Sequence, residues 1–325
     1  MTRIMADTVS SSAASRSNRV GATSKRKSCR VLRTARIPDS LSAYGLSLPA
    51  FLLIMLFLMG PVFAVVLMSF TNWLMGAASF DFVGLKNYKE MVGDPVFWLS
   101  LGNTLIYVGV VVPTAFFLSL LIAVLIEAHP SLRAFYRSAY FLPVAATVVA
   151  MALVWEFLLH PSFGPVNTIL RSLGLSGYSW LHDRDIVLWT LCVVGIWLKL
   201  GYYVVLFIAG LKSIPRELYD AAEVDGAERA WSQFSLITWP MLGPVSLFVL
   251  VIALIQSVQV FETVAVLTQG GPNKASEVLL YSLYQEGFEF FRVGYASALT
   301  VVFLSLVLLI TIVKVRVIEP RVHYS

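Results

Sequence analysis

Hydrophobic residues run through this chain in long stretches, and short polar segments separate them. The hydrocarbon core of a bilayer is about 30 Å thick, so a helix needs about 20 apolar residues to cross it. The first two stretches exceed this length, which predicts tilted or proline-kinked helices there. The pattern predicts an all-α membrane protein with six transmembrane helices, at residues 43–70, 99–126, 134–159, 186–211, 242–267 and 294–315.

The composition supports the membrane class and limits the number of domains. Of the 325 residues, 58% are hydrophobic and 13% are charged, whereas soluble domains carry about 25% charged residues. The polar connections are too short to hold a second soluble domain. We therefore expect a disordered basic cytoplasmic tail at residues 1–42, a transmembrane domain at 43–316 and a cytoplasmic tail at 317–325.

Lysine and arginine are distributed unequally between the two sides of the predicted bundle. Nine of them precede the first span, and Lys212, Arg216 and Arg229 lie between the fourth and fifth spans. The loops expected on the other side hold two each. Because basic loops remain cytoplasmic, both termini and the loop between the fourth and fifth spans are expected to be cytoplasmic.

The basic, serine-rich tail has two other interpretations. Residues 1–38 also have the composition of an organellar transit peptide. Nucleic-acid binding is a weaker alternative, because no aromatic residues interleave the charges. A disordered tail that enforces topology is the preferred interpretation, and no nucleic-acid partner is expected.

The chain carries no recognisable catalytic or metal-binding motif. Cys29 and Cys192 are expected in different compartments, and the four histidines are scattered. No H-E-x-x-H metal motif, G-x-S-x-G nucleophile motif or G-x-x-x-x-G-K-[ST] phosphate loop occurs. We therefore predict a protein that is not an enzyme, has no metal or cofactor of its own, and receives its free energy through contact with another protein.

A polar helix is predicted between the fourth and fifth spans, from Pro215 in its first turn to a stop at Gly226. A second short helix, apolar on one side, follows and ends at Pro240. Together they predict an L-shaped elbow that contacts a partner, although an amphipathic helix resting on lipid headgroups is the alternative. The expected coupling residues are Leu218, Asp220, Ala221, Ala222, Asp225 and Gly226.

This segment resembles a family signature. The run Tyr219-Asp220-Ala221-Ala222-x-x-Asp225-Gly226, followed by Ile237-Thr238-x-Pro240, resembles the EAA signature of binding-protein-dependent ABC transporter permeases, in their maltose and glycerol-phosphate branch. Residues 82–88 (FVGLKNY), 142–143 (LP) and 268–272 (TQGGP) match the same branch, so the resemblance covers about residues 43–315. Two features depart from the pattern. Asp220 replaces the leading glutamate, and the spacing from Gly226 to Ile237 is one residue longer.

The resemblance implies a multi-pass permease subunit of the bacterial inner membrane that imports a sugar or oligosaccharide. The elbow would be the coupling helix that docks on a dimer of ATP-binding subunits, where ATP and Mg²⁺ bind. A second permease chain, expected to be a distinct homologue, and an extracytoplasmic solute-binding protein would complete the assembly. The rival interpretation, a stand-alone secondary transporter or channel, predicts inverted repeats, and the two halves show no clear repeat.

Polar residues inside the predicted spans mark a substrate path, since each is costly in a bilayer unless it has a partner. Structural interhelical hydrogen bonding is the alternative. Lys199 favours an anionic sugar such as a uronate, unless a carboxylate neutralises it. Glu262 is its expected partner, and Glu156 is the alternative. The expected path residues are Lys199, Tyr202, Tyr203, Gln256, Ser257, Gln259, Glu262 and Thr263, and the family resemblance adds His160, Gly164 and Asn167.

Overall fold

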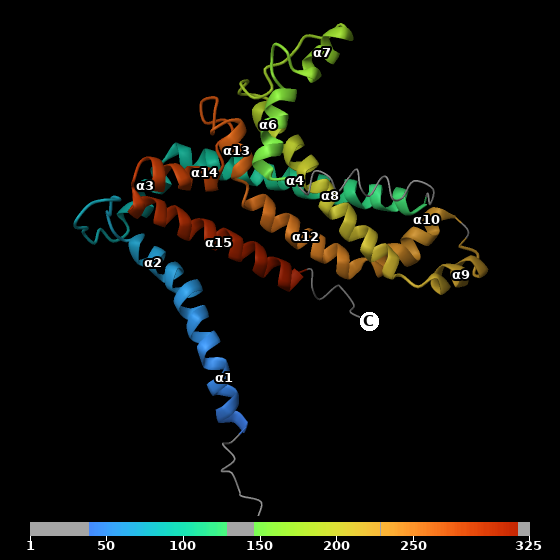
Figure 1. Ribbon diagram of the computed structural model, residues 1–325, viewed down its shortest axis with the longest axis horizontal. Coiled ribbons are helices and arrows are strands. Elements are labelled where there is room, and N and C mark those ends of the chain that lie inside the picture. The colour runs from blue at the N-terminus through green and yellow to red at the C-terminus, as the bar shows by residue number, and fades with distance from the viewer. Residues whose placement is uncertain (1–38, 129–145, 228, 318–325) are drawn as a thin grey trace, which may run out of the picture. The chain divides into compact units, whose positions relative to one another are not determined.

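The computed structural model describes residues 39–128, 146–227 and 229–317 (Figure 1). All regular elements of these residues are helical, and their one β-bridge joins Thr71 to Phe82. The chain divides into two compact units, residues Met1–Met55 and Leu56–Ser325. The described part of the first unit is α1 (Asp39–Ile54), which contains Pro49, together with Met55.

Four helical segments in the described residues are long and apolar enough to cross a membrane. A fifth candidate is a helix pair, Ala230–Met241 with Gly243–Val258, that bends by 68°. The expected all-α membrane class is therefore confirmed, whereas the count of six spans remains a prediction. The four long segments are Ser47–Met68, Pro95–Ala128, Val187–Ser213 and Val293–Ile312.

The third predicted span is only partly visible. Its second half contains α6 (Val148–Leu158), and Thr147 caps this helix by accepting a hydrogen bond from the Ala150 amide. Its first half lies outside the described residues, as do the Leu-Pro match at 142–143, the basic tail at 1–38 and the last eight residues. The first span is also less regular than expected, because a π-helical turn, η1 (Met55–Met59), separates α1 from α2 (Gly60–Met68).

The fifth predicted span is broken, and this corrects the expectation of one continuous helix over 242–267. Helix α12 (Gly243–Val258) ends, residues 259–261 lie outside any helix, and α13 (Glu262–Leu267) begins. Non-helical backbone in an apolar segment is tolerated where it is buried in protein or lines a cavity. The break coincides with the polar run that begins at Gln256, so side chains expected to form one stripe instead surround an irregular turn.

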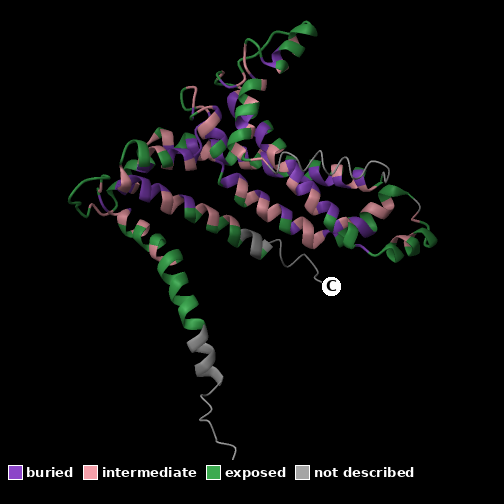
Figure 2. Ribbon diagram, viewed as in Figure 1, coloured by how far each residue is buried: buried purple, intermediate pink, exposed green. Residues whose placement is uncertain are grey.

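The core is built on two long helices, α4 (Pro95–Ala128) and α8 (Val187–Ser213). Phe116 and Phe207 pack edge to face between them with ring centroids 5.3 Å apart. Helix α12 completes this core with Val249 and Ala253. Figure 2 shows that buried residues gather along these three helices, whereas α2 and α9 (Arg216–Val224) are largely exposed.

Loops at one end of α4 are fixed by side-chain amides. Asn87 in α3 (Lys86–Gly93) donates to the carbonyl oxygens of Ser69 and Thr71, both at 2.8 Å. Asn103 in α4 donates to the carbonyls of Ala275 and Glu277, at 3.1 and 2.8 Å. The segments that match the family at 82–88 and 268–272 therefore belong to, or adjoin, loops with a structural role. The second loop leads into α14 (Leu279–Tyr284), η4 (Gln285–Glu289) and α15 (Val293–Val317).

One glycine allows α8 to approach α4 closely. A Cβ atom at Gly195 would overlap the hydroxyl of Tyr107, whose side chain is only 1% exposed. Gly195→Ala is expected to lower the free energy of unfolding by about 1–3 kcal/mol, the usual cost of overpacking. Gly109→Ala in α4 is the matched control, since no atom lies within 4 Å of the added carbon. Thermal unfolding of the purified permease would test this, and equal midpoints for the two variants would contradict it.

Candidate functional site

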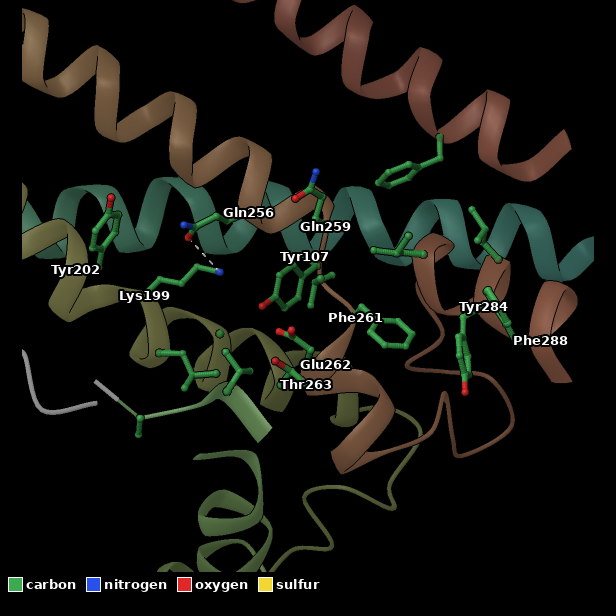
Figure 3. Close-up of a pocket in the computed structure, with 18 residues that line it drawn as sticks. Tyr107, Lys199, Tyr202, Gln256, Gln259, Phe261, Glu262, Thr263, Tyr284 and Phe288 are labelled. Atoms are coloured by element: carbon green, nitrogen blue, oxygen red, sulfur yellow. Dashed lines mark hydrogen bonds between the residues drawn. The ribbon is translucent and has the colours of Figure 1, made fainter. Parts of the chain in front are cut away.

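A cavity of about 830 Å³ opens beside the break between α12 and α13 (Figure 3). Its walls come from α4, the start of α6, α8, the broken segment, α14, η4 and α15. Ligand sites in proteins measure about 300–1,000 Å³, so this cavity can hold a small saccharide. The polar residues around it are Tyr107, Lys199, Tyr202, Gln256, Gln259, Glu262, Thr263 and Tyr284.

The structure brings together most of the substrate path expected from the sequence. Six of the eleven expected residues line the cavity. Two come from α8, and four come from the end of α12, the turn after it and the start of α13. A continuous helix would also place the four polar side chains of the fifth span within an arc of about 120°, and across the break they still line one cavity. These six residues are Lys199, Tyr202, Gln256, Gln259, Glu262 and Thr263.

Lys199 has a different partner from the one expected. Its Nζ donates to Oε1 of Gln256 at 3.3 Å, and the Tyr203 hydroxyl donates to the same oxygen at 3.2 Å. The described residues contain no ion pair between Lys199 and Glu262, although both line the cavity. The lysine is therefore held in place by a neutral amide, and its charge is not matched by a carboxylate in direct contact.

Two expected residues support the cavity without lining it. Tyr203 is fully buried and orients the Gln256 amide through the bond just described. Ser257 is also buried, and its hydroxyl finds no hydrogen-bond partner among the described residues. Both belong to the packing behind the cavity wall.

The three residues added by family resemblance lie away from the cavity, in a loop before and at the start of α7 (Pro165–Ser172). Asn167 is buried and donates to the carbonyls of His160, Pro161 and Tyr178 while its oxygen accepts from Tyr178 and Trp180. The His160 ring stacks on Phe163 with centroids 3.6 Å apart. Gly164 packs so closely on the His160 carbonyl that a side chain would overlap it. In this structure the three residues shape the loop.

Sequence reasoning missed four of the aromatic residues of the cavity. Tyr107, Tyr284, Phe288 and Phe303 all line it. An aromatic residue inside an apolar span gives no signal that separates packing from a binding role. Tyr284 and Phe288 lie in a segment that the sequence indicated only as a loop between the fifth and sixth spans.

The expected elbow is present and attached to the core. Helix α9 ends at Val224, and Gly226 has a φ of +89°, which suits a helix stop. The Tyr219 hydroxyl lies 2.9 Å from the Thr238 hydroxyl in η3 (Phe234–Thr238). The second helix is irregular, because α10 (Ala230–Gln233) continues through the π-helical η3 into α11 (Trp239–Met241).

Five of the six expected coupling residues are exposed on the surface, and one is not. Leu218, Asp220, Ala221 and Asp225 are exposed, as is Gly226. Ala222 is partly buried and packs, with Tyr219, against the hydrophobic core. It therefore faces the membrane domain, as does Tyr219, whose hydroxyl contacts Thr238 of η3. Val224, which the sequence did not single out, is 88% exposed.

The chain matches a known family over most of its length. The family described as "Binding-protein-dependent transport system inner membrane component" matches residues 95–324. The sulfoquinovosyl glycerol transport system permease protein SmoG of Agrobacterium fabrum is 32% identical over 284 residues, 87% of this chain and 92% of that protein. The sn-glycerol-3-phosphate transport system permease protein UgpA of Pectobacterium atrosepticum is 31% identical over 298 residues, 91% and 98% of the two chains.

A solved structure gives the same fold. In the crystal structure of a bacterial ABC transporter involved in the import of the acidic polysaccharide alginate, one chain matches with a TM-score of 0.73 and 25% identity. The match covers 86% of this chain and 96% of that chain. These relatives are transporter permeases rather than enzymes, as the sequence predicted. The chain belongs to the binding-protein-dependent transport system inner membrane components, as a permease subunit of the sugar ABC transporters.

Proposed function

We propose that this permease imports a sugar or oligosaccharide that carries an acidic group, and that its cavity forms half of the translocation path. The observation that carries the proposal is Lys199, a cation in the cavity wall whose direct partner is the neutral amide of Gln256. A carboxylate, sulfonate or phosphate of the substrate would make a charge-assisted hydrogen bond there. Glu262, on the same cavity, would accept hydrogen bonds from sugar hydroxyls.

The names of the relatives point to the same chemistry. Sulfoquinovosyl glycerol bears a sulfonate, glycerol 3-phosphate bears a phosphate, and alginate is named as an acidic polysaccharide. Their acidic groups differ, so an attraction for negative charge is the property that a shared site would need. A flexible lysine side chain can pair with acidic groups of different shapes, whereas a rigid arrangement of donors suits one kind of anion.

Coupling to ATP hydrolysis is proposed to pass through α9. Its exposed surface would dock on an ATP-binding subunit, which binds ATP and Mg²⁺, while Tyr219 joins it to Thr238. From η3 the chain runs through α11 and α12 directly to the break at the cavity. A movement of α9 would therefore reach the cavity wall along one run of chain, in a bundle that alternates between two states. A second permease and an extracytoplasmic binding protein would complete the inner-membrane assembly.

Reconstitution tests this function. The permease would be placed in proteoliposomes with its partner permease, ATPase and binding protein, and uptake of digalacturonate, glycerol 3-phosphate and maltose would be measured. We expect ATP-dependent uptake of at least one acidic probe in preference to maltose. Uptake by the permease without the ATPase would instead favour a stand-alone transporter. Uptake of maltose alone would overturn the acidic substrate while leaving the importer intact.

The joint between α9 and η3 gives a separate prediction. Tyr219→Phe removes the hydroxyl that contacts Thr238 and keeps the ring packed on the core. The loss of one hydrogen bond costs about 1 kcal/mol, so we expect the permease to fold and to bind the ATPase, with uptake per ATP hydrolysed reduced several-fold. Tyr178→Phe, in the loop after α7, makes the same change outside the elbow and is the control. An unchanged ratio of uptake to hydrolysis in Tyr219→Phe would show that the contact does not transmit movement.

A further inference from the structure

We infer that the cavity contains a second subsite, formed by the rings of Phe261, Tyr284 and Phe288, which binds the apolar ring faces of an oligosaccharide. The inference rests on the proposed function and specifies its substrate further. The ligand would be an acidic saccharide of more than one unit, bound with its acidic group at Lys199 and its remaining rings along the three aromatic side chains.

The three rings form a continuous strip. Phe261 and Tyr284 meet edge to face with centroids 5.2 Å apart. Tyr284 and Phe288 are inclined by 27° with centroids 5.5 Å apart, so they present nearly parallel surfaces. Figure 3 shows the strip grouped in one part of the cavity, apart from Lys199, Gln256 and Tyr202. The cavity is therefore amphipathic, with a polar part and an aromatic part.

The strip is fixed by the elements around it. The Leu279 amide at the start of α14 donates to the Thr104 hydroxyl of α4 at 2.9 Å. In η4, Glu286 pairs with Arg292 at 3.2 Å, and Arg292 also pairs with Glu90 of α3 and lies 4.5 Å above the Tyr295 ring. Burial raises the pKa of Glu286, and Asp94 and Glu90 raise it further, while Arg292 opposes them. A surface fixed before binding loses little entropy when a ligand arrives.

Two of the three aromatic side chains have exposed surface that a ligand could contact. The side chain of Tyr284 is 37% exposed and that of Phe288 is 60% exposed, although both line the cavity. One face of a pyranose ring carries mainly C–H groups, which favours contact with an aromatic face, while its hydroxyls remain free for polar partners. Polar residues lie beside the strip, so one ligand could stack its ring face on the aromatic side chains and hydrogen-bond its hydroxyls to the polar ones.

Two other roles would also leave these aromatic side chains exposed. They could anchor the protein at a membrane interface, or pack against a second permease. Either role acts on the whole assembly, so its loss would lower uptake of every substrate equally. A stacking subsite instead acts on substrates long enough to reach it. Dependence on saccharide length therefore separates the inference from both alternatives.

The experiment compares galacturonate with trigalacturonate as probes in the reconstituted transporter. For Phe288→Leu, and for Tyr284→Leu with Phe288→Leu, we expect the ratio of trimer to monomer uptake to fall about tenfold in the double variant. Tyr284→Phe keeps the ring and should keep the ratio. Phe290→Leu with Phe291→Leu is the matched control, because both rings are exposed yet do not line the cavity.

Each outcome is decisive. A lower ratio confined to the variants of the strip would support the subsite. Equal losses for monomer and trimer, or a ratio unchanged in the single and double variants, would overturn it while the wild-type uptake still supported the proposed function. A wild-type transporter that imports neither probe would overturn this inference before any variant is compared, whereas its uptake of glycerol 3-phosphate in preference to maltose would still support the proposed function.

Discussion

Lys199→Met is expected to lower ATP-driven uptake of an acidic sugar about a hundredfold. The lysine presents the positive charge of the cavity wall, and its direct partner is the Gln256 amide rather than a carboxylate. A hydrogen bond to a charged group contributes about 1.5–3 kcal/mol, and about 1.4 kcal/mol corresponds to a factor of ten. Methionine keeps most of the volume of the side chain and removes the charge. Initial rates of digalacturonate uptake in proteoliposomes would measure the effect.

Two controls separate a binding role from a structural one. Lys199→Arg keeps the positive charge and should retain most of the uptake. Gln256→Glu places a carboxylate next to Lys199, which should neutralise the cation and weaken acidic substrates nearly as much as Lys199→Met does. Basal ATP hydrolysis by the assembled transporter should stay unchanged in all three variants. Full uptake of digalacturonate by Lys199→Met would remove the basis for an anionic substrate.

The sequence predicts the helices of this protein well because a bilayer imposes one dominant requirement, about 20 apolar residues for each crossing. Helices α4, α8 and α15 begin and end within a few residues of their predicted bounds. The break after Val258 was not predicted, because Val260 and Phe261 are as apolar as a continuous helix requires. The tertiary structure accounts for the end of α12, because the chain leaves the helix at a cavity, where non-helical backbone is tolerated.

The candidate site was predictable in part for the same reason. Polar side chains in apolar spans identify themselves, and six of those expected do line one cavity. Their partners were not predictable, since the choice between Gln256 and Glu262 as the neighbour of Lys199 depends on the break between α12 and α13. The residues that resemblance suggested near α7 were placed by sequence position alone. In the structure, the Asn167 amide is already occupied by the surrounding loop.

Ala221→Arg is expected to abolish co-purification of the ATPase and to reduce ATP-driven uptake to background. Ala221 is exposed on α9, on the side turned away from Tyr219 and Ala222, which pack on the core. Each helical residue advances by about 100°, so Tyr219 and Ala221 point about 160° apart. An unpaired charge buried in an interface costs about 2–5 kcal/mol, enough to dissociate a complex that is held by one short helix. Pull-down of the ATPase and uptake in proteoliposomes would measure the two effects.

Glu223→Arg provides the matched control, because it adds the same side chain to an exposed position of the same helix about 200° further round. It should leave the ATPase bound, so a difference between the two variants would identify the docking side of α9. Retention of the ATPase by both variants would mean that the exposed side of α9 does not contact the ATPase. A loss in both, with the permease still monodisperse, would indicate a contact that surrounds the helix. If both variants keep the ATPase bound, the proposed path from α9 through Tyr219 to the cavity would also have no ATPase contact to move it.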